Sequence, residues 1–69
     1  MAYYITPQEQ KVLNFLTEYI KLHDYSPTQR EIGEALGTSR SLVEYFLTML
    51  EKKEKIKTPG KSRRNIQLI

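Results

Sequence analysis

The sequence has 69 residues, no cysteine, and one histidine, His23. Disulfides and thiolate metal sites are therefore excluded, and a single imidazole cannot build a metal site by itself. No apolar run approaches the roughly 20 residues that cross a bilayer. The N-terminal "MAYYITPQEQ" also has neither the basic stretch nor the long apolar segment of a signal peptide. We therefore expect a cytoplasmic protein without a metal, a cofactor or a membrane segment.

The features of an enzyme active site are also missing. The chain has no glycine-rich loop that could cradle phosphates and no cluster of carboxylates, and its one histidine has no second imidazole to work with. We therefore predict no catalytic residues and no small-molecule ligand. The hydrophobic fraction of 39% is sufficient for a folded chain. Because the chain has only 69 residues, we expect residues 1–69 to form one small domain, and a domain this short buries only roughly 60% of its unfolded surface.

The charges are distributed unevenly. Residues 1–37 carry three basic and five acidic side chains, a net charge of −2, whereas residues 38–69 carry eight basic and three acidic ones, a net charge of +5. From Lys55 onward there are five cations and no acid. Such asymmetry favours a polyanion as partner of the C-terminal half, although a solvated basic tail is the alternative.

The first 37 residues contain two helix signals. Thr6 and Glu9 form a capping-box pattern around Pro7, and Thr28 and Glu31 repeat that pattern. The first helix is predicted to end near residues 23–24, because Ser26 before Pro27 disfavours helix. Its apolar positions are Val12, Leu13, Phe15, Leu16, Tyr19 and Ile20, and those of the second helix are Ile32, Ala35 and Leu36.

A third helix is predicted over residues 38–53. Gly37 supplies the left-handed residue that ends the second helix, and Thr38 or Ser39 caps the third. Its inward residues are Val43, Phe46, Leu47 and Leu50. Two helices joined by a very short glycine-containing turn are typical of a helix-turn-helix, in which the small Ala35 is expected to permit close approach.

A basic β-hairpin is predicted after the third helix. Ile56 precedes the turn-rich "TPGKSRR", and "NIQLI" then alternates polar and apolar residues as a strand does. The hairpin forms a wing over residues 57–65 whose candidate phosphate contacts are Lys57, Lys61, Ser62, Arg63 and Arg64. The alternative for these cations is solubility and protection of a sheet edge.

These elements predict a mainly α fold with a small β-hairpin, a three-helix winged helix-turn-helix. The third helix would then enter the major groove of double-stranded DNA. Thr28, Gln29 and Arg30 begin the second helix, and a helix N-terminus is a natural site for phosphate. Plain helix capping is the alternative for Thr28. A packed three-helix domain without DNA remains possible at this point.

The chain resembles the N-terminal DNA-binding domain of LexA-type SOS repressors, in "SPTQREIGEALG", in the spacing of Val43, Leu47 and Leu50, and in "PGKSRRNIQL". The resemblance runs from about Thr6 to Leu68. It implies a winged helix-turn-helix and a bacterial or phage-type transcriptional regulator, most simply a repressor. It also implies that the base-reading residues are Ser39, Arg40, Ser41, Leu42, Glu44 and Tyr45, while Thr48 on the same face joins the DNA-backbone contacts.

Three features depart from that family. The turn "GTSRS" is one residue shorter than usual and lacks a proline, so a general bacterial winged-helix regulator fits it equally well. Glu54 occupies a position where glycine is usual, so the third helix either continues there or Glu54 is strained. The self-cleavage and dimerisation domain of the family is absent from these residues, so self-cleavage is not expected. The chain is either a stand-alone regulator or an excised domain.

The leading hypothesis is sequence-specific binding of double-stranded DNA. Because one small module reads few base pairs, a homodimer on a two-fold site is expected. The alternative is a winged-helix module that binds a protein through Tyr45, Phe46 and Met49.

Overall fold

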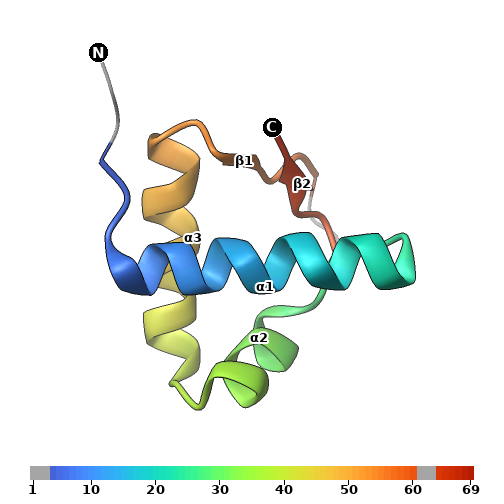
Figure 1. Cartoon of the computed structure of the whole chain (residues 1–69), viewed down its shortest axis with the longest axis horizontal. Coiled ribbons are helices and arrows are strands. Elements are labelled where there is room, and N and C mark those ends of the chain that lie inside the picture. The colour runs from blue at the N-terminus through green and yellow to red at the C-terminus, as the bar shows by residue number, and fades with distance from the viewer. Residues whose placement is uncertain (1–3, 61–63) are drawn as a thin grey trace.

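The computed structural model describes residues 4–60 and 64–69. Figure 1 shows three helices followed by a small antiparallel sheet, with α1 crossing α3 and with α2 and the sheet on either side of α1. The bounds are α1 Pro7–His23, α2 Gln29–Leu36, α3 Arg40–Lys52, β1 Ile56–Lys57 and β2 Gln67–Leu68. The predicted fold class is confirmed. Within the described residues, no helix is long and apolar enough to cross a membrane.

Both predicted capping boxes are present. The hydroxyl of Thr6 accepts a hydrogen bond from the Glu9 N–H at 3.2 Å, and the Glu9 carboxylate accepts one from the Thr6 N–H at 3.0 Å. Thr28 and Glu31 make the same pair of bonds at 3.1 and 2.8 Å. Each box satisfies two backbone donors that the first turn of a helix leaves unpaired, which fixes where α1 and α2 begin.

The turn of the helix-turn-helix is short because both of its ends are capped. Gly37 ends α2 with φ of 66°, and the Ser39 hydroxyl accepts from the Leu42 N–H at 3.2 Å. Ser39 rather than Thr38 is therefore the N-cap of α3. The helix begins at Arg40 and ends at Lys52, so the prediction of residues 38–53 was too long at both ends.

All three helices and the wing contribute to one core. Its buried apolar residues are Val12, Leu16, Ile32, Val43, Leu47, Leu50, Ile56 and Ile66. All six helical positions that form this core were predicted from their spacing, and Leu36 and Phe46 pack against it half-buried. Ile56 and Ile66 come from the two sides of the hairpin, so the wing is packed onto the helices rather than projecting freely from them.

Ala35 does not have the role predicted for it. Its side chain is exposed, whereas Gly33, two residues earlier on α2, is buried. A Cβ atom at Gly33 would lie 3.0 Å from the Thr38 carbonyl oxygen and 3.7 Å from Cγ2 of Val43. The close approach of α2 to the turn and to α3 therefore depends on Gly33. The prediction named the wrong small residue because Ala35 and Gly33 lie on different faces of α2.

Glu54 adopts the left-handed conformation, with φ of 59°. Helix α3 has already ended, and the Lys55 N–H bonds the Leu50 carbonyl across the turn at 3.0 Å. Of the two alternatives for this position, continuation of the helix is wrong and the strained residue is observed. The left-handed region is costly for a residue with a Cβ atom, because Cβ approaches the following carbonyl oxygen.

Replacing Glu54 by glycine is expected to raise the free energy of unfolding by about 0.5–1 kcal/mol. Glycine adopts positive φ without the Cβ clash, although it gives the unfolded chain more freedom and so offsets part of the gain. Urea denaturation followed by circular dichroism measures the change. Glu54→Ala is the matched control, since it removes the same carboxylate and keeps Cβ. A gain of equal size in the alanine variant would show that charge rather than backbone strain is responsible.

Candidate nucleic-acid interface

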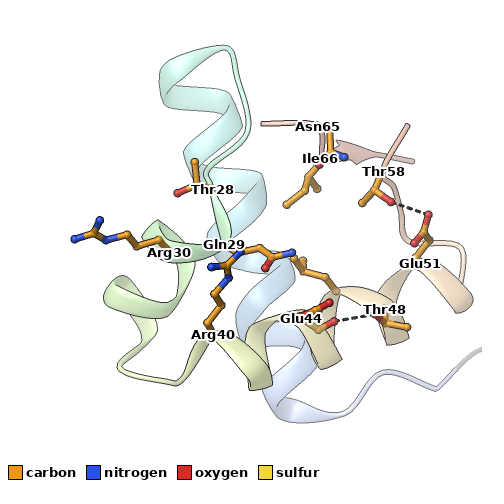
Figure 2. A pocket seen from close by; sticks show the side chains of 11 residues that line it. Thr28, Gln29, Arg30, Arg40, Glu44, Thr48, Glu51, Thr58, Asn65 and Ile66 are labelled. Atoms are coloured by element: carbon orange, nitrogen blue, oxygen red, sulfur yellow. Dashed lines mark hydrogen bonds between the residues drawn. The ribbon is translucent and has the colours of Figure 1, made fainter. Parts of the chain in front are cut away.

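A pocket of about 560 Å³ lies between the start of α2, the outer face of α3 and the wing (Figure 2). Six of the predicted DNA-contacting residues line it: Thr28, Gln29, Arg30, Arg40, Glu44 and Thr48. The sequence separates these residues by up to 20 positions, and the helix-turn-helix brings them to one surface. Among the described residues, no group of three histidine, aspartate or glutamate side chains could hold a metal ion.

Two helix N-termini meet at one side of this pocket. Gln29 is the first residue of α2 and Arg40 the first of α3, and both line the pocket and a second, smaller hollow over the turn. Arg30 extends away from the pocket in Figure 2 and forms an exposed ion pair with Glu34 at 3.4 Å. An exposed pair of this kind is weak, so it does not prevent Arg30 from reaching an anion.

The outer face of α3 is polar at its N-terminal half. Val43, Leu47 and Leu50 are buried on the opposite face. The exposed residues are Arg40, Ser41, Leu42, Glu44, Tyr45 and Thr48, which are five of the six predicted base-reading residues together with one predicted backbone contact. The sixth, Ser39, is exposed immediately before the helix. All six predicted base-reading residues are therefore exposed, and of these six Arg40 and Glu44 line the pocket.

Two of these exposed residues, Leu42 and Tyr45, are large hydrophobic side chains. Leu42 is 48% exposed and Tyr45 is 56% exposed, and the Tyr45 ring contacts Phe46 with centroids 5.7 Å apart. Phe46 itself packs against the core. The Tyr45 ring therefore packs on a side chain that the core holds in place. Within the described residues, its hydroxyl makes no hydrogen bond.

Side-chain hydrogen bonds join the wing to α3 and also join the two sides of the wing to each other. Thr58 donates to the Glu51 carboxylate at 2.9 Å, and Asn65 donates to the Gly60 carbonyl at 3.2 Å. β1 pairs with β2 so that Lys57, which is exposed, faces Gln67. Thr58, Glu51 and Asn65 also line the pocket but were not predicted as site residues. Their signal in the sequence is only their position on either side of the Pro-Gly turn.

The rest of the predicted wing surface is not covered by the structure. Lys61, Ser62 and Arg63 lie outside the described residues. Their contacts to the DNA backbone therefore stay predictions.

Arg64 binds protein groups at the base of the wing. Its guanidinium donates to both carboxylate oxygens of Glu31, at 3.0 and 3.1 Å, and to the Ser26 carbonyl at 3.0 Å. It also contacts the Tyr19 hydroxyl at 3.3 Å and lies 4.7 Å from the centroid of the Tyr25 ring. This arrangement could not be predicted from the sequence, because Arg64 and Glu31 are 33 residues apart. Contact of Arg64 with the DNA backbone stays a prediction.

The pKa values of this pair follow from its hydrogen bonds. The backbone N–H of Thr28, followed by the Arg64 guanidinium, lowers the pKa of the Glu31 carboxyl to about 2. Glu31 in turn raises the pKa of Arg64 above its usual range. Both groups are therefore charged throughout the neutral range, and the pair stays intact there.

The Glu31 carboxyl is expected to contribute to acid unfolding. Because its pKa is lower in the folded state, its contribution is complete above about pH 4.5 and is lost as the pH falls towards about 2. Glu31→Gln should therefore be less stable than the wild type at neutral pH, with a difference that narrows over this window. Urea denaturation at a series of pH values measures it.

Glu34→Gln is the control for this titration, because it removes an exposed carboxylate from the same helix. The free energy of unfolding of Glu34→Gln should stay close to that of the wild type at every pH. A Glu31→Gln difference that is constant from pH 7 to pH 2 would contradict the prediction.

Comparison with known proteins agrees with this geometry. The family model of the LexA DNA binding domain matches residues 3–64. The chain belongs to this family. The chain is 39% identical over 66 residues to the LexA repressor of Desulforamulus reducens and 41% identical over 66 residues to that of Geotalea uraniireducens. A LexA repressor of a Nocardioides species is 46% identical over 50 residues.

These LexA repressors are longer proteins. The first two matches cover 94% of this chain but only 31% and 33% of the respective repressor, and the third covers 71% of this chain and 20% of the repressor. The matches thus span between a fifth and a third of the length of these relatives. The resemblance noted in the sequence to the LexA DNA-binding domain is confirmed over nearly the whole chain.

Proposed function

We propose that this domain binds double-stranded DNA in a sequence-specific manner and represses transcription. The observation that carries the proposal is the exposed polar face of α3, from Arg40 to Thr48, beside the N-terminus of α2 and the wing. The major groove is about 12 Å wide and admits one helix. The neighbouring helix N-terminus and the wing then lie where the phosphates on either side of that groove would be.

The chemistry of the α3 face suits base edges. Arg40 can form two hydrogen bonds to guanine, and Glu44 can accept one from the amino group of cytosine. Ser39 and Ser41 can each donate or accept. Leu42 and the ring of Tyr45 are exposed enough to contact a thymine methyl, and Tyr45 adds a hydroxyl.

The backbone contacts would flank this reading surface. On the α2 side they are Thr28, Gln29 and Arg30, where the N–H groups and the partial positive charge of the helix N-terminus favour a phosphate. On the other side they are Thr48 and Lys57, together with Lys61, Ser62 and Arg63. Such contacts add affinity and set the register of α3 but carry little sequence information.

Repression by one domain would be weak, because a single module buries only roughly 600–1,000 Å² on DNA. We therefore propose a homodimer on a two-fold operator, acting in the bacterial cytoplasm. Light scattering with and without a selected duplex reports on this assembly. A single domain on every bound duplex would contradict it.

Selection from random duplexes followed by sequencing tests the proposed function. We expect one enriched motif with the wild type and a changed motif with Tyr45→Ala, because Tyr45 lies on the reading face. Tyr4→Ala removes a tyrosine of the N-terminal arm that is even more exposed than Tyr45, and it should leave the motif unchanged. No enrichment at low salt would contradict DNA reading. A protein complex that survives high salt and uses the α3 face would support the protein-binding alternative instead.

A further inference from the structure

The base of the wing is fastened to the loop between α1 and α2 at two places. The buried Ser26 hydroxyl accepts a hydrogen bond from the Ile66 N–H at 3.2 Å, and its carbonyl accepts from Arg64 at 3.0 Å. Ser26 is only 3% exposed, so its bond with Ile66 is buried, whereas the bond from the partly exposed Arg64 side chain is only partly buried. Arg64 adds its two bonds to Glu31, which is in the first turn of α2.

We propose that Arg64 is a positioning residue, which holds the wing at a fixed angle to α2 and α3 through Glu31 and Ser26 rather than by contacting phosphate. The inference rests on the proposed DNA-binding function. It assigns Arg64 a role different from that of the other wing cations, although all of them belong to the same basic segment of the sequence.

Glu31 is suited to this role because it serves two parts of the interface at once. Its Oε1 atom accepts from the Thr28 N–H at 2.8 Å and from Arg64 at 3.0 Å, so the residue that caps α2 also holds the wing. Thr28, which is the N-cap residue, and Gln29, which is the first residue of α2, are both proposed to contact the DNA backbone. The two phosphate-binding sides of the interface are therefore connected through one carboxylate.

Both terminal nitrogens of the Arg64 guanidinium donate to protein groups. Two parallel N–H···O bonds to a carboxylate are the strongest arrangement available to arginine, and they fix its plane. The side chain also lies 4.7 Å from the centroid of the Tyr25 ring, which covers one of its faces. Breaking these contacts to reach a phosphate would leave the Glu31 carboxylate and the Ser26 carbonyl without this donor.

Glu31→Gln distinguishes positioning from phosphate contact by the sign of its effect. If Arg64 binds phosphate, loss of the Glu31 charge releases the guanidinium and removes an acid near the DNA, so binding becomes tighter. If Arg64 positions the wing, loss of that charge weakens the attachment and binding becomes weaker. Glutamine still offers an oxygen to the Thr28 N–H, so the cap of α2 is retained.

The test is fluorescence anisotropy with the selected duplex, well below the Tm of each variant. We expect Glu31→Gln and Arg64→Gln each to raise Kd about 10-fold, and the double variant to raise it by no more than about that factor, because both remove one interaction. The salt dependence of log Kd should be unchanged in both variants, since neither loses a phosphate contact. Glu34→Gln, which removes an acid from the same helix, should bind no more weakly than the wild type.

Two results of the binding experiment would overturn the proposal: tighter binding by Glu31→Gln, or a salt slope that falls by about 0.9 in Arg64→Gln. An NMR comparison of the free proteins needs no DNA, and we expect the amide signals of Lys57, Ile66 and Gln67 to shift in both variants. Unchanged signals would also overturn it. If the wild type binds no duplex specifically, the proposed function fails, and the NMR result still decides whether the pair positions the wing.

Discussion

Raising the salt concentration from about 50 to about 200 mM is expected to weaken binding of one domain to a half-site duplex by about 150-fold. With Arg64 assigned to its pair with Glu31, four cations remain as predicted phosphate contacts: Arg30, Lys57, Lys61 and Arg63. Each phosphate that is neutralised releases counterions and adds about −0.9 to the slope of log K against log salt, so four contacts give a slope of about −3.6. Anisotropy titrations at five or more salt concentrations measure this slope.

Single substitutions measure how much each residue contributes to the slope of log K against log salt. Arg30→Gln and Lys57→Gln should each make it shallower by about 0.9, whereas Tyr45→Ala should change the preferred sequence and leave the slope as it was. Lys11→Gln is the charge-matched control, because Lys11 is exposed on α1 and is not a predicted contact. If Lys11→Gln changes the slope as much as Lys57→Gln does, binding depends on overall charge rather than on these contacts.

A dimer on a full operator would make the effect larger. Two domains with four contacts each would double the slope to about −7, since counterion release adds over the whole interface. The comparison of half-site and full-site duplexes therefore reports contacts per domain and assembly in the same experiment. A slope near zero on both duplexes would contradict a phosphate-based interface altogether.

The helices could be predicted because their signals are local. Thr6 with Glu9 and Thr28 with Glu31 lie three residues apart, and each pair makes its bonds within one turn of helix. Apolar spacing then indicated which face of each helix is inward, and the core residues of α3 were assigned correctly. The exposed face of α3 consists of the residues that this assignment leaves, so its members could be predicted from the sequence.

The interactions that set the angle between elements could not be predicted. Arg64 and Glu31 are 33 positions apart, and Lys53 and Glu9 are 44 apart. In the sequence these residues look like ordinary surface charges, and only the packing of α1, α2, α3 and the wing shows that they meet. The same holds for Gly33, because propensity alone does not distinguish a glycine that is needed for close approach from an alanine two residues later.

The pair of Lys53 and Glu9 is the buried ion pair on which the second large effect depends. The Lys53 ammonium donates to the Glu9 carboxylate, and the side chains are 15% and 3% exposed. Glu9 also caps α1 through Thr6, so the pair joins the start of α1 to the end of α3. Burial opposes the charge on Glu9, but the hydrogen bonds from Lys53 and Thr6 lower the pKa of its carboxyl below the ordinary value.

Lys53→Met is expected to lower the free energy of unfolding by about 3 kcal/mol, because it leaves a buried carboxylate without its cation. This value is at the lower end of the range for removing one partner of a buried ion pair, since Lys53 retains some contact with water. It is nevertheless a large part of the roughly 5–15 kcal/mol that stabilises a domain. Urea denaturation at pH 7 measures the loss. Lys52→Met, on the exposed neighbouring residue, should change stability by no more than about 0.5 kcal/mol.

Two further variants identify the buried charge as the cause of the Lys53→Met loss. Glu9→Gln combined with Lys53→Met removes both charges and keeps the cap, so it should recover to within about 1 kcal/mol of the wild type. Lowering the pH should also narrow the gap between Lys53→Met and the wild type. The wild type loses the contribution of a carboxyl whose pKa is lowered, while the variant is relieved of a buried charge as Glu9 takes up a proton. A double variant as unstable as Lys53→Met would mean that the lysine stem stabilises the fold by packing, and that the ion pair contributes little.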